Sequence, residues 1–295
     1  MKSLLLSAIL TVATSFSFAQ DLLDMLTEEL DKDKKPDYVT ATFKATRLSN
    51  GHSVETLAAG VLDVRISHRF GYVNNGIEDL FGLDQATNRL ALEYGVTNQL
   101  MVGFGRSSYQ KELDGFVKYK VIRQATNGAP VTVTAFSSIM LNTNSYADPT
   151  RENYYSSRLS YAFEGMIARK FTEAFSLQLM PTMVHYNLAP TPNTNNNIYA
   201  LGVGGRLKLN KRISMNAEYY YQLPDTQYTG TTNSLAMGFD IETGGHVFQL
   251  YFTNSTGINE RAFITETTGD FFNGDIRFGF HLSRVFTLKD PRKKG

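Results

Sequence analysis

The chain of 295 residues contains no cysteine and no tryptophan. Without cysteine the protein has no disulfide scaffold, no thiolate-bound zinc site and no lipidated N-terminal cysteine. Its 29 Lys and Arg side chains are balanced by 28 Asp and Glu side chains, which leaves a formal net charge of +1. A nucleic-acid-binding protein normally carries a basic excess, so we expect no nucleic-acid partner.

Long apolar runs and catalytic motifs are also scarce. Outside the N-terminus no apolar run reaches the roughly 18 residues of a membrane-spanning helix. The Gly-x-Ser-x-Gly motif of serine hydrolases is absent, and His68 and Ser255 form no recognisable catalytic constellation. The histidines lack a metal-binding spacing such as His-x-x-x-His. The sequence therefore predicts a protein that is not an enzyme and has no metal or cofactor, with a surface enzyme as the minor alternative.

The N-terminus has the features of a secretory signal. Lys2 supplies a positive charge, residues 4–12 form an apolar core, and Ser17-Phe18-Ala19 places small residues at the cleavage positions. We expect residues 1–19 to be removed by cleavage after Ala19, so that the mature chain starts at Gln20. A transmembrane anchor is the alternative, and the short apolar run disfavours it.

Residues 20–56 form a separate N-terminal segment. The stretch from Asp21 to Asp31 places leucines at helical spacing opposite acidic residues, which predicts a short amphipathic helix. Such a helix either docks on a partner or the barrel mouth, or frays in solution because short helices are marginal alone. The stretch from Tyr38 to Thr46 alternates only weakly. We place it in the lumen or the periplasm, since adding it to the wall would make the strand number odd.

After Gly60, apolar and polar residues alternate with period two, which predicts strands that face two different media. The pattern is clearest from Ile198 to Tyr221, and it is ambiguous near Phe136 and Met140, which compete for the outer face. Repeats of this pattern predict an all-β, closed antiparallel transmembrane β-barrel of about twelve strands, with ten or fourteen as alternatives. The barrel occupies residues 57–287, and residues 288–295 form a basic tail.

The lengths of the connections predict the orientation of this barrel. Short connections, such as residues 210–212, alternate with long ones, such as residues 71–87 and 254–274. Outer-membrane barrels have short periplasmic turns and longer external loops. We therefore expect the long connections outside the cell and the short ones in the periplasm.

A soluble β-sandwich would also bury one face of every strand, so alternation alone does not exclude it. The secretory signal favours the barrel, and so do apolar faces that run without charge over most of each strand. The opposite faces carry many charges in mid-strand, and in a dry core an unpaired charge is strongly destabilising. Closure into a barrel also removes the exposed strand edges.

Four long segments carry a more specific signal: GVLDVRISHRFG from Gly60, FGLDQATNRLALEYGVTNQLMVGFGRS from Phe81, DGFVKYK from Asp114 and DIETGGHVFQLYFTNSTG from Asp240. They resemble segments of an uncharacterised outer-membrane β-barrel family of Gram-negative bacteria, a domain of unknown function. The resemblance covers the chain from Tyr38 to Phe286. It implies a barrel in the outer membrane, and it implies no established activity or site residues.

Charged side chains recur on the inward-facing side of the predicted strands. In a channel such side chains line the pore and set its selectivity. In a narrow lumen they instead form a structural network of ion pairs, which the even mixture of nine basic and seven acidic residues favours. The candidate lumen-lining residues are Asp63, Arg65, Arg69, Arg89, Glu93, Lys118, Lys120, Arg158, Glu164, Arg206, Lys208, Glu218, Asp240, Glu242, Asp275 and Arg277.

Two functions from different classes are consistent with these patterns. The first is a passive channel or transporter for small solutes. The second is a non-conducting structural or partner-binding barrel, which a plugged lumen would favour. The expected partners are outer-membrane lipid, the barrel-assembly machinery and, where the acidic helix docks, a periplasmic partner at the stretch from Asp21 to Asp31.

Overall fold

A computed structural model of the chain describes residues 36–289, apart from residues 147, 151, 190–193 and 245. The predicted signal sequence, the predicted acidic helix and most of the predicted basic tail lie outside the described residues. Within the described ranges, no helix has the length and apolar character needed to cross a membrane.

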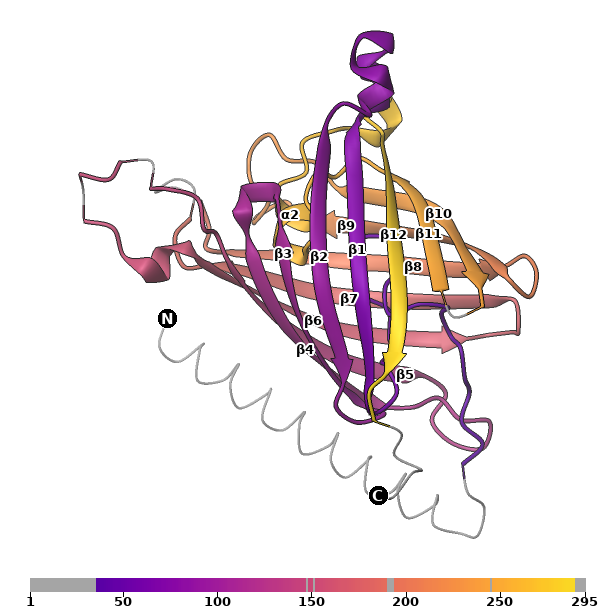
Figure 1. Cartoon of the computed structure of the whole chain (residues 1–295). Helices are drawn as coiled ribbons and strands as arrows, with labels where there is room; N and C mark the ends of the chain where they lie inside the picture. Colours follow the sequence, from indigo (N-terminus) through magenta and orange to yellow (C-terminus); the bar gives the residue numbers. More distant parts are fainter. Residues whose placement is uncertain (1–35, 147, 151, 190–193, 245, 290–295) are drawn as a thin grey trace.

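Twelve antiparallel strands form a closed barrel in sequence order, and β1 closes it by pairing with β12 as well as with β2. The predicted all-β barrel of twelve strands is confirmed (Figure 1). Its strands are β1 (Val61–Tyr72), β2 (Ala86–Gly95), β3 (Leu100–Ser107), β4 (Leu113–Ile122), β5 (Thr132–Leu141), β6 (Leu159–Lys170), β7 (Phe175–Tyr186), β8 (Asn197–Lys208), β9 (Ile213–Gln222), β10 (Ser234–Thr243), β11 (His246–Thr253) and β12 (Arg277–Thr287).

Most short turns gather at one end of this barrel and most long loops at the other. We call these the short-turn end and the long-loop end. The alternation expected from the sequence has one exception, because the connection expected to be long between β3 and β4 spans only residues 108–112, whereas the one expected to be short between β4 and β5 spans residues 123–131. The start of β1 and the finish of β12 both lie at the short-turn end, because Val61 pairs with Thr287. The helices lie mainly in the long loops: η1 (Val73–Asn75), η2 (Ile77–Gly82), η3 (Tyr109–Lys111), η4 (Tyr155–Arg158), α2 (Glu260–Thr265) and η5 (Phe271–Asn273).

Successive side chains of each strand point to opposite faces of the wall. In β10, the Phe239 side chain is 44% exposed on the outer face, whereas Asp240 is 2% exposed on the inner face. The ambiguity in β5 is resolved, since Phe136 and Met140 are both buried on the inner face beside Thr134 and other polar residues. Outward-facing apolar side chains thus form a continuous coat, while the core of the protein lies in the lumen.

The lumen is filled rather than open, and glycines in the wall make the room for its contents. A methyl group on Gly204 of β8 would lie only 2.4 Å from the Leu48 side chain, which comes from the segment before β1. Met101, Met180 and Tyr220 are fully buried on the inner face. A chain segment and large wall side chains together occupy the space that water would fill in an open pore.

Candidate functional site

The stretch before β1 occupies the lumen, and we call residues 41–57 the lumenal segment. Residues 45–54 are all buried. The segment makes a hairpin, since Leu48 N–H donates to the Gly51 carbonyl (2.9 Å) and Ser53 N–H donates to the Thr46 carbonyl (3.0 Å). The stretch from Tyr38 to Thr46 therefore enters the lumen, one of the two places proposed for it from the sequence.

Both ends of the lumenal segment emerge at the short-turn end of the barrel. Before the segment, Val39 N–H donates to the Gln124 carbonyl in the β4–β5 turn (2.9 Å). After it, Ala59 N–H donates to the side-chain oxygen of Asn98 in the β2–β3 turn (3.0 Å). The segment is therefore a loop inserted from one side, which Figure 1 shows in indigo within the ring of strands.

Wall side chains hold the lumenal segment mainly by its backbone. An extended segment without a neighbouring strand leaves its N–H and C=O groups unpaired, and buried groups of this kind require partners. Seven strands supply them from the side chains Lys118, Thr134, Gln178, Arg206, Glu218, Gln249 and His281.

The tip of the hairpin is fixed by a carboxylate. Glu218 of β9 accepts hydrogen bonds from the backbone N–H groups of Asn50 and Gly51. The Asn50 side chain accepts a hydrogen bond from Arg69 (2.6 Å) and donates to Ser234 Oγ (3.1 Å). Only glycine fits at position 51, because a Cβ there would lie 2.2 Å from the Tyr220 hydroxyl oxygen.

A second segment enters the lumen from the long-loop end, and we call residues 254–267 the lumenal loop. It contains α2, whose residues are all buried, and Figure 1 shows α2 within the ring. Asn259 caps the helix by accepting a hydrogen bond from Ala262 N–H (3.0 Å). The sequence predicts residues 254–274 as an exposed external loop. That is wrong for the lumenal loop, because the short helix satisfies its own backbone and packs inward.

Arg261 of α2 anchors the lumenal loop to the β3–β4 connection, which contains η3 and Glu112. Its Nε donates to a carboxylate oxygen of Glu112 (2.9 Å), and its guanidinium also pairs with Glu266. Burial opposes the charge of Arg261, but the two carboxylates raise its pKa well above the ordinary value. The helix is therefore held by its side chains, in contrast to the backbone contacts of the lumenal segment.

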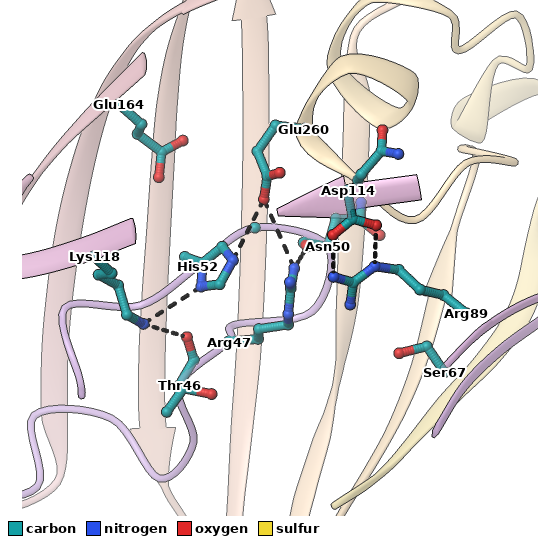
Figure 2. Close-up of polar contacts among 12 residues, drawn as sticks. Thr46, Arg47, Asn50, His52, Ser67, Arg89, Asp114, Lys118, Glu164 and Glu260 are labelled. Carbon is teal, nitrogen blue, oxygen red and sulfur yellow. Dashed lines mark hydrogen bonds and ion pairs between the residues drawn. The ribbon is translucent and has the colours of Figure 1, made fainter. Parts of the chain in front are cut away.

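The two lumenal elements meet at Glu260 (Figure 2). One Glu260 oxygen lies 3.7 Å from Arg47 and 3.6 Å from His52 Nε2, so both contacts are longer than hydrogen bonds. Lys118 of β4 approaches the other ring nitrogen of His52 at 3.4 Å and donates to the Thr46 carbonyl at 3.1 Å. Because an ammonium group only donates, Nδ1 of His52 is the acceptor and Nε2 carries the proton.

Burial determines the protonation of this junction. It lowers the pKa of His52 well below the ordinary value, and the nearby Arg47 and Lys118 cations lower that pKa further. Burial also raises the pKa of Glu260, while Arg47 opposes the rise. His52 is therefore neutral at neutral pH.

The structure places the candidate lumen-lining residues in three groups. Ten of them are buried on the inner face of the wall: Asp63, Arg65, Arg69, Arg89, Glu93, Lys118, Glu164, Arg206, Glu218 and Asp240. Several pair with one another or with neighbouring wall residues, as Arg65 does with Asp63 (2.9 Å) and Arg89 with Asp114. Mixed charges thus neutralise one another within the wall.

The second group lies towards the ends of the strands, where its members are half-buried or, for Glu242, exposed. Lys120 pairs with Glu55 of the lumenal segment (3.3 Å), Arg277 stacks 3.6 Å from the Tyr72 ring centre, and Lys208 ends β8. Glu242 is exposed at the short-turn end and pairs with Lys44 of the segment.

The third group lies outside the wall. Arg158 belongs to η4, where its guanidinium stacks 3.6 Å from the Tyr146 ring centre. Asp275 precedes β12 and accepts hydrogen bonds from Asn74 (2.9 Å) and from Asp270 N–H (2.9 Å). At both places the apolar–polar alternation of the sequence continues beyond the end of the strand. Assigning residues from alternation alone therefore predicts strands that are longer than the observed ones.

Sequence reasoning missed several of the residues that hold the lumenal segment. It counted charges, whereas the neutral side chains Gln178, Gln249 and His281 hold the backbone of the lumenal segment. Neutral amides in mid-strand, on the polar face, are the signal that was available for the first two. Within the described part of the chain, no group of three or more potential ligands is arranged to hold a metal ion.

A closed barrel with an apolar outer face and a charged, self-occupied lumen is a membrane-bound β-barrel. The sequence pattern of the family described as "Membrane bound beta barrel domain (DUF5777)" matches residues 43–286, and the chain belongs to this family. The matched region begins inside the lumenal segment, so that segment is part of the domain.

Several solved structures are similar to the chain in overall fold. A NanC porin is 10% identical with a TM-score of 0.48, and the match covers 77% of this chain and 98% of that one. An outer membrane channel from Pseudomonas putida F1 is 14% identical with a TM-score of 0.47, covering 79% and 98%. The outer membrane protein Omp33 of Acinetobacter baumannii is 11% identical with a TM-score of 0.40, covering 76% and 97%. No curated protein matches the sequence. At these values the family assignment rests on the sequence match.

Proposed function

We propose that the chain is an outer-membrane barrel that is closed in the described state and becomes a passive channel for small polar solutes when the lumenal segment leaves. The position of that segment carries this proposal. Both of its ends emerge at the short-turn end, at Gln124 and Asn98, so it can withdraw without threading a chain end through the barrel.

The chemistry of the inner face supports a water-filled state. Glu218, Gln249 and Arg206 would exchange the backbone groups of the segment for water molecules, and side chains of this kind are well hydrated. Rings of charged and polar side chains set selectivity in open pores. An inner face built only for permanent packing would bury apolar residues instead, because removing charges from water is unfavourable.

A non-conducting, partner-binding or structural barrel is the second candidate. Leu48 and Val54 of the segment are fully buried in the central core cluster, and the lumenal loop fills the lumen from the opposite end. If these contacts never open, the lumen is a permanent core. The N-terminal region from Asp21 to Asp31 would then be a docking site for a periplasmic partner.

In both candidates the apolar outer face meets outer-membrane lipid and the barrel-assembly machinery inserts the protein. The proposed orientation places the short-turn end in the periplasm. A tag in η2, which lies in an exposed long loop, should then be labelled on intact cells, whereas a tag at Asn210 should not. Recovery of the protein from the soluble periplasmic fraction would contradict the proposed location.

An engineered disulfide separates the two candidates, and the absence of native cysteine makes it unambiguous. Asn50→Cys combined with Ser234→Cys joins two side chains that contact each other at 3.1 Å. In planar bilayers the oxidised protein should show no conductance, and reduction of the disulfide should restore channel openings. The Asn50→Cys and Ser234→Cys single variants are the controls for each substitution. If no conductance is measured in any state, including after deletion of residues 20–56, the channel function is contradicted and the second candidate is favoured.

A further inference from the structure

Many contacts that hold the lumenal segment are made to its backbone and depend little on its sequence, whereas Thr46 and Arg47 add side-chain contacts to Glu93. Gln178 illustrates the backbone contacts, because its side-chain oxygen accepts from Val54 N–H (2.8 Å) and its amide nitrogen donates to the His52 carbonyl (2.8 Å). The amide thus replaces the edge of a neighbouring strand. Any extended peptide offers the same pair of groups at this position.

The same arrangement recurs around the lumen. Gln249 donates to the carbonyls of Arg47 (3.1 Å) and Leu48 (2.7 Å). His281 contacts the Ser49 carbonyl at 2.6 Å, and its other ring nitrogen contacts Ser67 Oγ at 2.8 Å. Because a carbonyl only accepts, the ring nitrogen that faces Ser49 carries the proton.

Two cations complete the set of side chains that bind the backbone of the segment. Lys118 donates to the carbonyls of Thr46 (3.1 Å) and Ser53 (3.2 Å), and Arg206 donates to those of Ala41 (2.8 Å) and Thr42 (3.2 Å). Recognition through main-chain groups gives affinity for extended peptides in general, while side-chain pockets give selectivity.

The tip of the lumenal segment is the place where the lumen selects a sequence. Glu218 requires two successive N–H groups in a turn, Arg69 and Ser234 recognise the Asn50 amide, and Tyr220 excludes any side chain at Gly51. A turn of small residues with Asn-Gly at its tip satisfies all of these groups.

We propose that the lumen is a binding site for an extended peptide hairpin, delivered from the short-turn end, and that the lumenal segment is its built-in occupant. The ligand is thus a second polypeptide with an Asn-Gly turn, which replaces residues 41–57 after they withdraw. This proposal rests on the withdrawal of the lumenal segment, as the proposed function does, but peptide binding requires no conductance. An experiment can therefore contradict the channel without contradicting peptide binding, and the reverse.

The test uses the folded, full-length chain with a protease site inserted between Ala58 and Ala59. Ala58 is exposed at the short-turn end, so the barrel can be cut after folding. Mild urea then removes the freed segment. Binding of fluorescent synthetic peptides to the emptied barrel in detergent is measured by anisotropy.

Three peptides based on residues 37–57 distinguish backbone from side-chain recognition. The first has the native sequence. The second keeps Leu48, the Asn-Gly tip and the buried Arg47 and His52 but replaces Lys44 and Glu55 with glutamine, and we expect its affinity to remain within about tenfold, because partly exposed ion pairs contribute little. The third is N-methylated at Gly51, which removes one N–H from Glu218. We expect a loss of roughly 10- to 100-fold, as for other hydrogen bonds to charged groups.

Matched controls isolate these effects. N-methylation at Ala45, whose N–H makes none of the described wall contacts, should change affinity much less than N-methylation at Gly51. In the wall, Gln178→Leu should weaken the first and second peptides alike. Thr182→Val should not weaken them, since the Thr182 hydroxyl contacts only Glu164 and the Met180 carbonyl among the described residues.

The proposal is overturned if the native peptide fails to bind the emptied barrel. It is also overturned if the glutamine-substituted peptide fails while the Gly51-methylated peptide binds. That second result would mean that the lumen recognises the side chains of its own segment and takes no other occupant.

Discussion

The lumenal segment and the lumenal loop fill the same cavity from opposite ends, yet they are held by different means. The loop contains α2, which satisfies its own backbone, so it is held by its side chains, as in the pair of Arg261 with Glu112 of the β3–β4 connection. The segment forms only a short hairpin, so the wall supplies partners for its backbone.

This difference indicates which of the two elements is able to leave. Removing α2 would separate Arg261 from Glu112 of the β3–β4 connection, and unpaired buried charges are strongly unfavourable. Removing the segment separates one buried pair, Arg47 with Glu93, but it also frees many amides, hydroxyls and backbone groups, for which water is a good substitute. We therefore expect the segment to be the exchangeable part of the barrel and α2 to be a fixed part, so the proposed channel passes beside α2 at the long-loop end.

The predictions about the lumenal segment share one reporter. Ser53 is fully buried in the segment and the chain has no native cysteine, so Ser53→Cys provides a single thiol. When the segment leaves, a maleimide reagent reaches this thiol. The labelling rate therefore reports the population of the open state when closing is faster than labelling.

The largest effect should come from Arg261→Met, which leaves Glu112 as an uncompensated buried charge. Breaking a buried ion pair in this way costs about 3–5 kcal/mol. We expect a large drop in the midpoint of thermal unfolding. Glu266→Gln is the control, because Glu266 is more exposed than Glu112 and its loss should matter less. Similar midpoints for the two variants would mean that the loop is not fixed by this pair.

Gly51→Ala should act on the segment and leave the barrel intact. The new methyl group would clash with the Tyr220 hydroxyl, and overpacking of this kind costs about 1–3 kcal/mol. Reporter labelling should accelerate roughly 5- to 150-fold, which is the same free energy expressed as a population ratio. Tyr220→Phe removes the clashing oxygen and should partly restore protection. No rescue would place the effect elsewhere in the hairpin.

The barrel could be predicted from the sequence because apolar and polar residues alternate with period two along each strand. In β10, the apolar Phe239 and the charged Asp240 identify an outer and an inner face by their chemistry alone. No comparable pattern in the sequence predicts that the lumen is closed. Residues 41–57 contribute mostly backbone groups, which every residue has, so no side-chain pattern marks their place. Phe136 and Met140 face inward because the occupied lumen gives them neighbours, and that depends on contacts far away in sequence.

Acid should loosen the segment through His52. In water its pKa is about 6.5, and in the closed barrel burial lowers that pKa well below this value. As the pH falls below 6.5, the released segment takes up a proton that the closed state does not. The closed state therefore loses up to about 1.4 kcal/mol for each pH unit until the lowered pKa is reached.

The charged groups around His52 shape this response. Arg47, Lys118, Arg65 and Arg89 oppose its protonation, while Glu260 takes up its own proton more readily when buried and so opposes the loosening at lower pH. Because the thiolate is the reactive form, each labelling rate is divided by that of a free thiol at the same pH. This ratio should rise between neutral pH and mild acid, and His52→Gln should remove the rise while keeping Glu260. Equal pH profiles for the two proteins would show that other groups control acid opening.

The smallest effect should come from the ion pair at the short-turn mouth. Lys44 of the segment contacts the Lys211 carbonyl (3.2 Å) and pairs with Glu242, whose side chain is 48% exposed. Exposed pairs contribute about 0–1 kcal/mol and are screened by salt. Lys44→Met should therefore change reporter labelling by less than about fivefold, and the change should shrink at high salt.

Lys120→Met is the matched variant, since the pair with Glu55 is less exposed and should be less sensitive to salt. A large effect of Lys44→Met at all salt concentrations would mean that the mouth, and not the backbone contacts deeper in the lumen, keeps the segment in place.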